Sequence, residues 1–133
     1  MSDIVADTHA AVWYLFEPQR LSADALAAMQ AAVASGGTIY VSVISVVEVW
    51  HLADKGRVPA SVYSDFMTAL CDARVAIKPL ALDLAIVRAA EAIPRQVLPD
   101  MPDRMIAATA LHRGLPLVTK DHRIRAAAVA TVW

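Results

Sequence analysis

The sequence predicts an α/β fold, a sandwich in which helices cover a central, mainly parallel sheet of four to five strands. Short Val- and Ile-rich runs alternate with longer Ala-rich segments of helical character. The Val- and Ile-rich runs are continuously apolar, as expected of strands buried on both faces. Because parallel strands need long crossover connections, this alternation favours right-handed βαβ units. No linker divides the chain, so we expect one domain spanning residues 1–133.

The first strand is predicted at residues 4–7, where the apolar run "IVA" stops at Asp7. From Thr8, apolar residues recur at helical spacing until Pro18 ends the pattern. Ser22 is a suitable N-cap for a helix at 23–34, which the following glycine pair terminates. The run "TIYVS" at 38–42 predicts the second strand.

Residues 43–56 are ambiguous, because their composition favours a strand that would be implausibly long if joined to "TIYVS". We therefore predict a helix capped by Ser42 and ended by Gly56. Its apolar face would consist of Val43, Val46, Val47 and Trp50. The remaining predicted elements, in chain order, are a helix at 59–72 with Pro59 in its first turn, a strand at 75–80, a helix at 82–93, a proline-rich loop at 94–102, a helix at 103–114, a strand at 115–119 and a fifth strand at 127–133.

Charge and cysteine content exclude several classes of protein. Twelve basic and 13 acidic residues give a net charge of −1, so the surface as a whole does not attract nucleic acid. Cys71 is the only cysteine, which excludes an internal disulfide and a thiolate metal cluster, and we expect it to be buried. The chain starts without a basic leader, and no apolar run reaches about 18 residues. We expect a cytoplasmic protein with no membrane partner.

Four carboxylates occur where this topology would bring them together. Asp7 and Asp121 follow strands, Glu48 lies in the helix after the second strand, and Asp103 opens a helix. In parallel sheets, ligands bind beyond the carboxyl ends of the strands. Carboxylates gathered there repel one another, and a hard dication removes the conflict. Oxygen ligands without a Cys or His motif favour Mg²⁺ or Mn²⁺, which can activate water and neutralise phosphate charge.

Each acid also has a purely structural interpretation. Asp7 and Asp103 could cap the helices that follow them. Glu48 could close a capping box with Ser45, because "SVVE" matches the S-x-x-E pattern. Asp121 could be an ordinary turn residue. Their shared location is therefore a stronger indication of function than any one of them.

Several segments resemble the PIN-domain family, and more narrowly the VapC-type toxins of bacterial type II toxin–antitoxin pairs. They are "IVADTHAAVW", "TIYVSVISVVEV", "PDRMIAATALHRGLPLVTKD" and the terminal Trp133. The resemblance implies Mg²⁺- or Mn²⁺-dependent ribonuclease activity, a VapB-like antitoxin and a homodimer. It also implies that Asp7, Glu48, Asp103 and Asp121 form the catalytic, metal-binding quartet. Thr119 matches a hydroxyl residue that supports the first Asp, and Thr8 follows that Asp as the family's Thr or Ser does.

Asp100 matches a second acid that often precedes the family's main Asp, and we expect it to be peripheral. The sequence departs from the family in having "DMPDR" where an aromatic residue often precedes the Asp. For binding RNA phosphates, the candidates are Arg104 beside Asp103, and Lys120 and Arg123 beside Asp121. Arg125 belongs to the same basic run.

Three tryptophan and tyrosine residues in the first and third helices have two interpretations. Trp13, Tyr14 and Trp50 could pack in the core, or they could line an apolar groove for an antitoxin segment or a second subunit. Other functions remain open as alternatives. They are a PIN or flap-type nuclease acting on DNA or in RNA processing without a toxin role, a receiver-like module that accepts phosphate, and a catalytically silent PIN scaffold.

Overall fold

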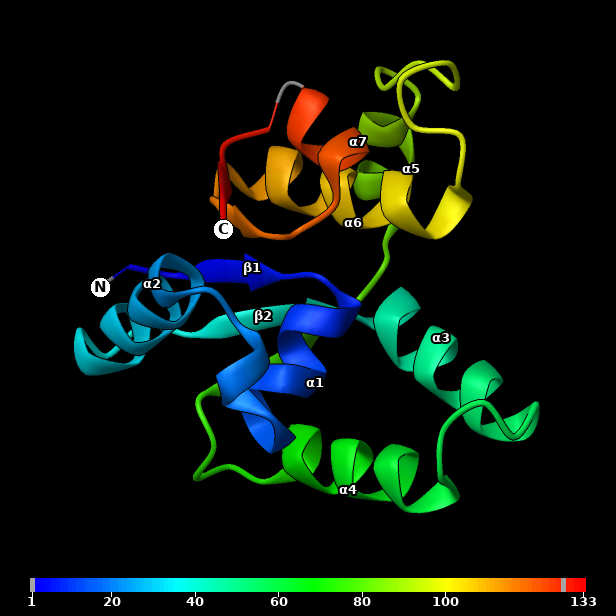
Figure 1. The fold of residues 1–133 in the computed structure, drawn as a ribbon. Coiled ribbons are helices and arrows are strands. Elements are labelled where there is room, and N and C mark those ends of the chain that lie inside the picture. Colours follow the sequence, from blue (N-terminus) through cyan, green and yellow to red (C-terminus); the bar gives the residue numbers. More distant parts are fainter. Residues whose placement is uncertain (1, 128) are drawn as a thin grey trace.

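The computed structural model describes residues 2–127 and 129–133 (Figure 1). Its centre is a sheet of five strands that all run parallel, in the order β3-β2-β1-β4-β5. The strands are β1 (Ile4–Ala6), β2 (Ile39–Ser42), β3 (Ile77–Leu80), β4 (Leu117–Val118) and β5 (Thr131–Val132). The predicted α/β class and parallel sheet are confirmed. All five carboxyl ends lie along one edge.

Helices cover both faces of the sheet (Figure 1). On one side lie α1 (Thr8–Phe16), α2 (Ala23–Ala34) and α4 (Ala60–Cys71), with a short 3-10 turn, η1 (Pro18–Arg20), after α1. On the other lie α5 (Leu84–Ala90), α6 (Met101–Arg113) and α7 (His122–Ala126). Between the layers, at the carboxyl edge, α3 (Val43–Asp54) contacts α1, α4 and α6. No helix in the described part of the chain is long and apolar enough to cross a membrane.

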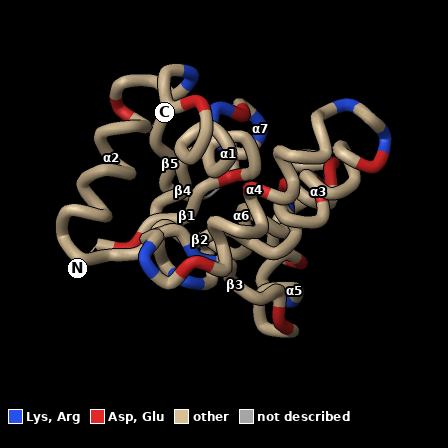
Figure 2. Tube along the Cα trace, turned by 90° about the horizontal axis from the view of Figure 1, so that it is seen from below, with Lys and Arg blue, Asp and Glu red and all other residues tan. Residues whose placement is uncertain are grey.

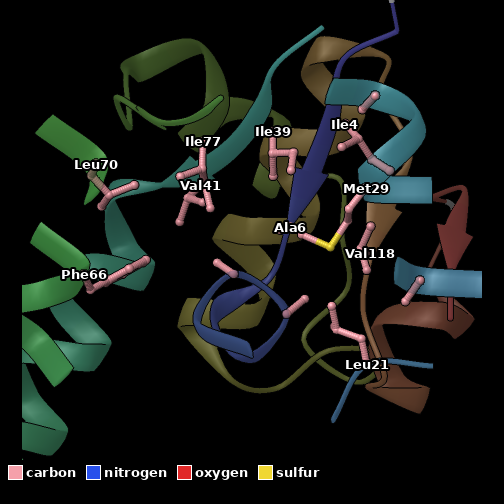
Figure 3. Close-up of a cluster of buried hydrophobic side chains, with 14 of the residues drawn as sticks. Ile4, Ala6, Leu21, Met29, Ile39, Val41, Phe66, Leu70, Ile77 and Val118 are labelled. Carbon is pink, nitrogen blue, oxygen red and sulfur yellow. The ribbon is translucent and has the colours of Figure 1, made fainter. Parts of the chain in front are cut away.

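Two apolar clusters hold the layers to the sheet. Successive side chains of a strand point to opposite faces, so Ile4 and Ala6 join one cluster while Val5 joins the other. Figure 3 shows the first cluster, in which Met29 of α2 reaches Ala6 and Phe66 of α4 lies near the end of β2. The side chains of Met29 and Phe66 are fully buried. This packing fixes where the strand ends lie.

The structure corrects several details of the helices. In α3 the buried side chains are Ser45 and Val49. Val46 packs against the first apolar cluster as predicted, whereas Val47 and Trp50 are 50% and 52% exposed, so the predicted apolar face is wrong at those two positions. Tertiary contacts with α1, α4 and α6 decide which side of this largely apolar helix is covered. Pro59 is the N-cap of α4 and lies outside its first turn. Cys71, at the end of that helix, is exposed.

The C-terminal third differs most from expectation. Helix α6 starts at Met101, two residues before the predicted start, so Asp103 lies in the first turn and does not cap the helix. Helix α7 was not predicted, because five residues rich in charge carry little periodicity. The predicted strand at 127–133 includes residue 128, which lies outside the described residues. Within the described part of that segment, only Thr131 and Val132 pair with β4.

Candidate active site

Five acidic residues from four parts of the chain line one cleft at the carboxyl edge of the sheet. The cleft has a volume of about 1160 Å³. Asp7 follows β1, Glu48 lies in α3, Asp100 and Asp103 lie at the start of α6, and Asp121 follows β4. The chain runs from β1 outward to β2 and β3 and then returns to β4, so the cleft lies where the strand order reverses. Figure 2 shows acidic positions from separate elements around the region where α1, α3 and α7 approach one another.

Asp7 is both a helix cap and a lining residue of the cleft. Its Oδ1 accepts a hydrogen bond from the Ala10 N–H at 2.8 Å, and the residue is only 8% exposed. Burial raises the pKa of this carboxyl group, while hydrogen bonds from Thr119 and Ala10 and the charge of His9 lower it. The nearby Asp121 carboxylate raises it further. The capping role and a role in the cleft are therefore compatible in one side chain.

Glu48 is held by a chain of hydroxyl groups. The Thr8 Oγ1 lies 2.6 Å from Glu48 Oε1 and 2.8 Å from Ser45 Oγ. Thr8 has a single hydroxyl hydrogen and an ionised carboxylate can only accept, so Thr8 donates to Glu48 and Ser45 donates to Thr8. The capping box of Ser45 and Glu48 is not formed, because the side chain of Ser42 caps α3 through the Ile44 N–H.

The hydrogen bonds that link Ser45, Thr8 and Glu48 should contribute to the stability of the fold. Replacing Thr8 with Val removes the acceptor of the fully buried Ser45 hydroxyl, so we expect a loss of about 1–3 kcal/mol in the free energy of unfolding. Thr8→Ser keeps the hydroxyl and should lose less. In chemical denaturation, the double variant Thr8→Val/Ser45→Ala should lose less than the sum of the single variants. Strict additivity would show that the two hydroxyl groups do not interact.

Asp103 is influenced by every other acid in the cleft. Burial, followed by the charges of Asp121, Glu48, Asp100 and Asp7, raises the pKa of its half-buried carboxyl group to about 6. Burial is the largest of these causes, and the four carboxylates contribute because they lie near Asp103. The acids that the sequence singled out are therefore brought into one electrostatic cluster.

Thr119 connects the first and last acids of this cluster. Its side chain is fully buried at the end of β4. Its Oγ1 accepts a hydrogen bond from the Asp121 N–H at 3.1 Å, and a hydrogen bond from its side chain lowers the pKa of Asp7. Asp121 in turn caps α7 by accepting from the Arg123 N–H at 2.8 Å. The first contact holds the backbone at Asp121, and the other two engage the carboxylates of Asp7 and Asp121, which line the cleft.

Basic and aromatic residues surround the acids. Lys120 and Arg123 lie along the cleft, whereas Arg104 is not among its lining residues and buries its Nε without a hydrogen-bond partner in the described structure. Trp13 and Trp133, which the sequence analysis named without placing them here, also border the cleft. Sequence reasoning missed the other members of this rim, which are His9, Arg20, His51, Arg57 and His122. One signal was available for His51, which follows Glu48 by three residues on one helix. For Arg57 we find no sequence signal.

The chemistry of this donor set suits a hard dication. Five carboxylates line the cleft, and Mg²⁺ or Mn²⁺ prefers such oxygen ligands. No three His, Cys, Asp or Glu side chains within residues 2–127 and 129–133 form a metal-binding group by themselves. Mg²⁺ is commonly held by one or two carboxylates together with water and substrate phosphates. The residues present therefore fit an ion that is completed by its substrate.

Known proteins identify the family to which this chain belongs. The PIN-domain family model matches residues 4–130, so the chain belongs to the PIN-domain family. Within that class, it is 32% identical to Ribonuclease VapC22 of Mycobacterium tuberculosis (strain ATCC 25618 / H37Rv), over 136 aligned residues that cover both chains completely. The resemblance to the VapC-type toxins is thereby confirmed.

Three solved structures share the fold. VapBC2 from Rickettsia felis, bound to a DNA fragment from its promoter, matches 97% of this chain and 96% of its own with a TM-score of 0.72 at 13% identity. A toxin–antitoxin complex from Klebsiella pneumoniae matches 98% and 96% with a TM-score of 0.65 at 22% identity. FitAcB from Neisseria gonorrhoeae matches 96% and 95% with a TM-score of 0.59 at 21% identity.

Proposed function

We propose that this protein is a VapC-like toxin, an endoribonuclease of the cytoplasm that hydrolyses RNA phosphodiester bonds with the help of Mg²⁺ or Mn²⁺. The observation that carries the proposal is the convergence of Asp7, Glu48, Asp103 and Asp121 in one cleft. The full-length identity to a protein named as a VapC ribonuclease supports the same conclusion.

The four acids would hold the ion, which when bound lowers the pKa of water and neutralises charge on a phosphate. The other residues prepare the acids for this role. Thr119 and the helix N-terminus at Ala10 favour the ionised form of Asp7 against the cost of burial. Thr8 holds Glu48, which lines the cleft, through a hydrogen bond to its Oε1. Lys120 and Arg123, on its rim, provide positive charge for the phosphates of the strand.

Two protein partners complete the proposal: a VapB-like antitoxin and a second copy of the chain in a homodimer. A smaller, mostly apolar groove of about 510 Å³ lies among α1, α3 and α4 and is lined by residues such as Phe16, Leu52 and Val62. An apolar face of an antitoxin segment would bury surface there. Val47 and Trp50, one turn apart on α3, add exposed apolar area that an interface between copies could cover.

Purified protein is expected to cleave RNA in Mg²⁺ or Mn²⁺ and to lose this activity in excess chelator. Activity should return when the ion is restored, because the acids would then hold it again. The assay uses matched panels of RNA and DNA oligonucleotides, single-stranded and structured, with product sizes as the readout. Cleavage of DNA alone would favour the flap-type alternative, and cleavage that chelator leaves unchanged would contradict the proposed role of the acids.

Expression of the chain in bacteria tests the toxin role. We expect growth arrest that is relieved by co-expression of the neighbouring reading frame and absent for Asp7→Asn. Growth that is unaffected by a soluble, RNA-cleaving protein would leave the nuclease proposal intact and contradict the toxin assignment.

A further inference from the structure

One wall of the acidic cleft is aromatic. Trp13 of α1 and Trp133, which follows β5, come from opposite ends of the chain and line the cleft together with His9 and Arg20. The ring centroids of Trp13 and Trp133 are 6.1 Å apart with an interplanar angle of 56°. The His9 ring lies 5.5 Å from Trp13. The Arg20 guanidinium lies over the Trp13 ring, with its Cζ 4.4 Å from the centroid.

Core packing explains only part of this arrangement. Trp13 and Trp133 are partly exposed and pack against the first apolar cluster, as core-facing residues would. Both nevertheless border the cleft that contains Asp7 and Asp103. Arg20 already places a planar cation on the face of Trp13, so that face accommodates a flat group. The ion pair of Arg20 with Glu17 is solvent-exposed and therefore weak, and an exposed cation–π contact contributes only about 0.5–1 kcal/mol, so a base can displace the guanidinium from Trp13 at a small cost.

These features match what unpaired RNA requires. Sequence-tolerant recognition of single strands combines positive charge along the backbone with aromatic or guanidinium planes on which bases stack. Lys120 and Arg123 provide the charge and the tryptophan pair provides the planes, on the same cleft as the acids. A base within an A-form duplex is stacked on its neighbours and cannot lie on an indole ring.

We propose that Trp13 and Trp133, assisted by Arg20, form a stacking platform that positions an unpaired nucleobase of the substrate next to the scissile phosphate. This inference rests on the proposed ribonuclease function and adds two residues that position its substrate. The platform binds and positions the strand, and the carboxylates remain the groups that act at phosphorus.

Tryptophan fluorescence tests the contact directly. The protein is placed in the Asp7→Asn background with Mg²⁺, and three variants each keep one tryptophan, with Phe at the other two positions. Oligoadenylate of about ten nucleotides is within the length that single-strand sites cover. It should quench the variants that keep Trp13 or Trp133. The variant that keeps Trp50 is the matched control, because Trp50 is 52% exposed and does not line the cleft. Equal quenching of all three would overturn the proposal.

Affinity measurements give a second test. Trp13→Ala and Trp133→Ala are each expected to weaken oligoadenylate binding about 5- to 150-fold, Trp133→Phe much less, and Trp50→Ala not at all. A third measurement compares oligoadenylate with an abasic oligomer, a ribose-phosphate chain without bases. This comparison can be made with the parent protein alone, so it remains informative if Trp13→Ala fails to fold. The abasic oligomer should bind the parent weakly and show no dependence on Trp133. Equal affinity of the parent for the two oligomers would overturn the platform.

The proposed ribonuclease function and the proposed stacking platform can each be contradicted without the other. If the wild-type protein cleaves RNA but binds the abasic oligomer as well as oligoadenylate, the ribonuclease function stands and the platform is wrong. If base-dependent quenching occurs but the wild type cleaves no RNA in Mg²⁺ or Mn²⁺, the platform stands as a binding site and the ribonuclease function is wrong. A fully paired RNA that quenches as strongly as oligoadenylate contradicts the stacking of an unpaired base on the two tryptophan rings.

Discussion

Asp7→Asn is expected to abolish RNA cleavage while leaving the fold intact. The substitution removes the negative charge from the centre of the acidic cluster, and we expect at least a 100-fold loss of rate, as for other groups that stabilise charge at a reaction centre. The side-chain oxygen of Asn can still accept from the Ala10 N–H, because Asn is as good an N-cap as Asp. Cleavage of an RNA oligonucleotide and thermal unfolding measure the two effects.

Asp24→Asn is the matched control for this experiment. Asp24 lies in the first turn of α2, is exposed and does not line the cleft, so its variant should cleave RNA at the wild-type rate. Asp7→Ala is less informative, because it also removes the cap, at a cost of about 1 kcal/mol. Substantial cleavage by a folded Asp7→Asn variant in Mg²⁺ or Mn²⁺ would contradict the proposed site.

Asp103→Asn is expected to stabilise the metal-free protein at neutral pH while abolishing cleavage. The pKa of Asp103 is raised from 3.8 to about 6, so the folded state disfavours its ionised form. A shift of this size corresponds to about 3 kcal/mol at full burial. The group is only half-buried and solvent screens it, so we expect a gain of roughly 1–2 kcal/mol in the free energy of unfolding.

The sign of the pH dependence follows from the direction of the pKa shift. The wild type bears the full cost of ionised Asp103 above pH 6 and none of it well below 3.8, so its stability relative to Asp103→Asn falls as pH rises between these values. Denaturation in chelator at pH 4 and pH 7.5 measures this change. Added Mg²⁺ should stabilise the wild type more than the variant. An Asp103→Asn protein that is less stable than the wild type at pH 7.5 without metal would show that the carboxylate contributes favourably to the fold.

Local pattern was enough to predict much of the fold. The caps at Ser22 and Ser42, which accept from Ala25 and Ile44 N–H groups, depend on residues two or three positions away. Gly114 ends α6 in a left-handed conformation with φ of 65°, which glycine adopts without steric cost. The exposed side of α3 could not be predicted, because apolar residues occur around much of that helix and only its neighbours select the buried face.

Local sequence pattern likewise identified some residues of the candidate site but not the contacts between them. Asp7 and Asp121 were identifiable because each follows a strand in a sheet whose direction the sequence pattern predicts. The link from Ser45 through Thr8 to Glu48 joins residues 37 to 40 positions apart, so no local pattern encodes it. The pairing of Trp13 with Trp133 requires β5 to close the edge of the sheet beside β4.

Hydrophobic period and capping chemistry act over a few residues, so the α/β class, the strand directions and the acids that line the cleft could be predicted without a structure. The packed fold was needed to establish which hydroxyl group holds Glu48, which basic and aromatic side chains border the cleft, and how its neighbours affect Asp103. Those properties depend on distances between groups far apart in the chain, and such distances are fixed only when the layers pack against the sheet.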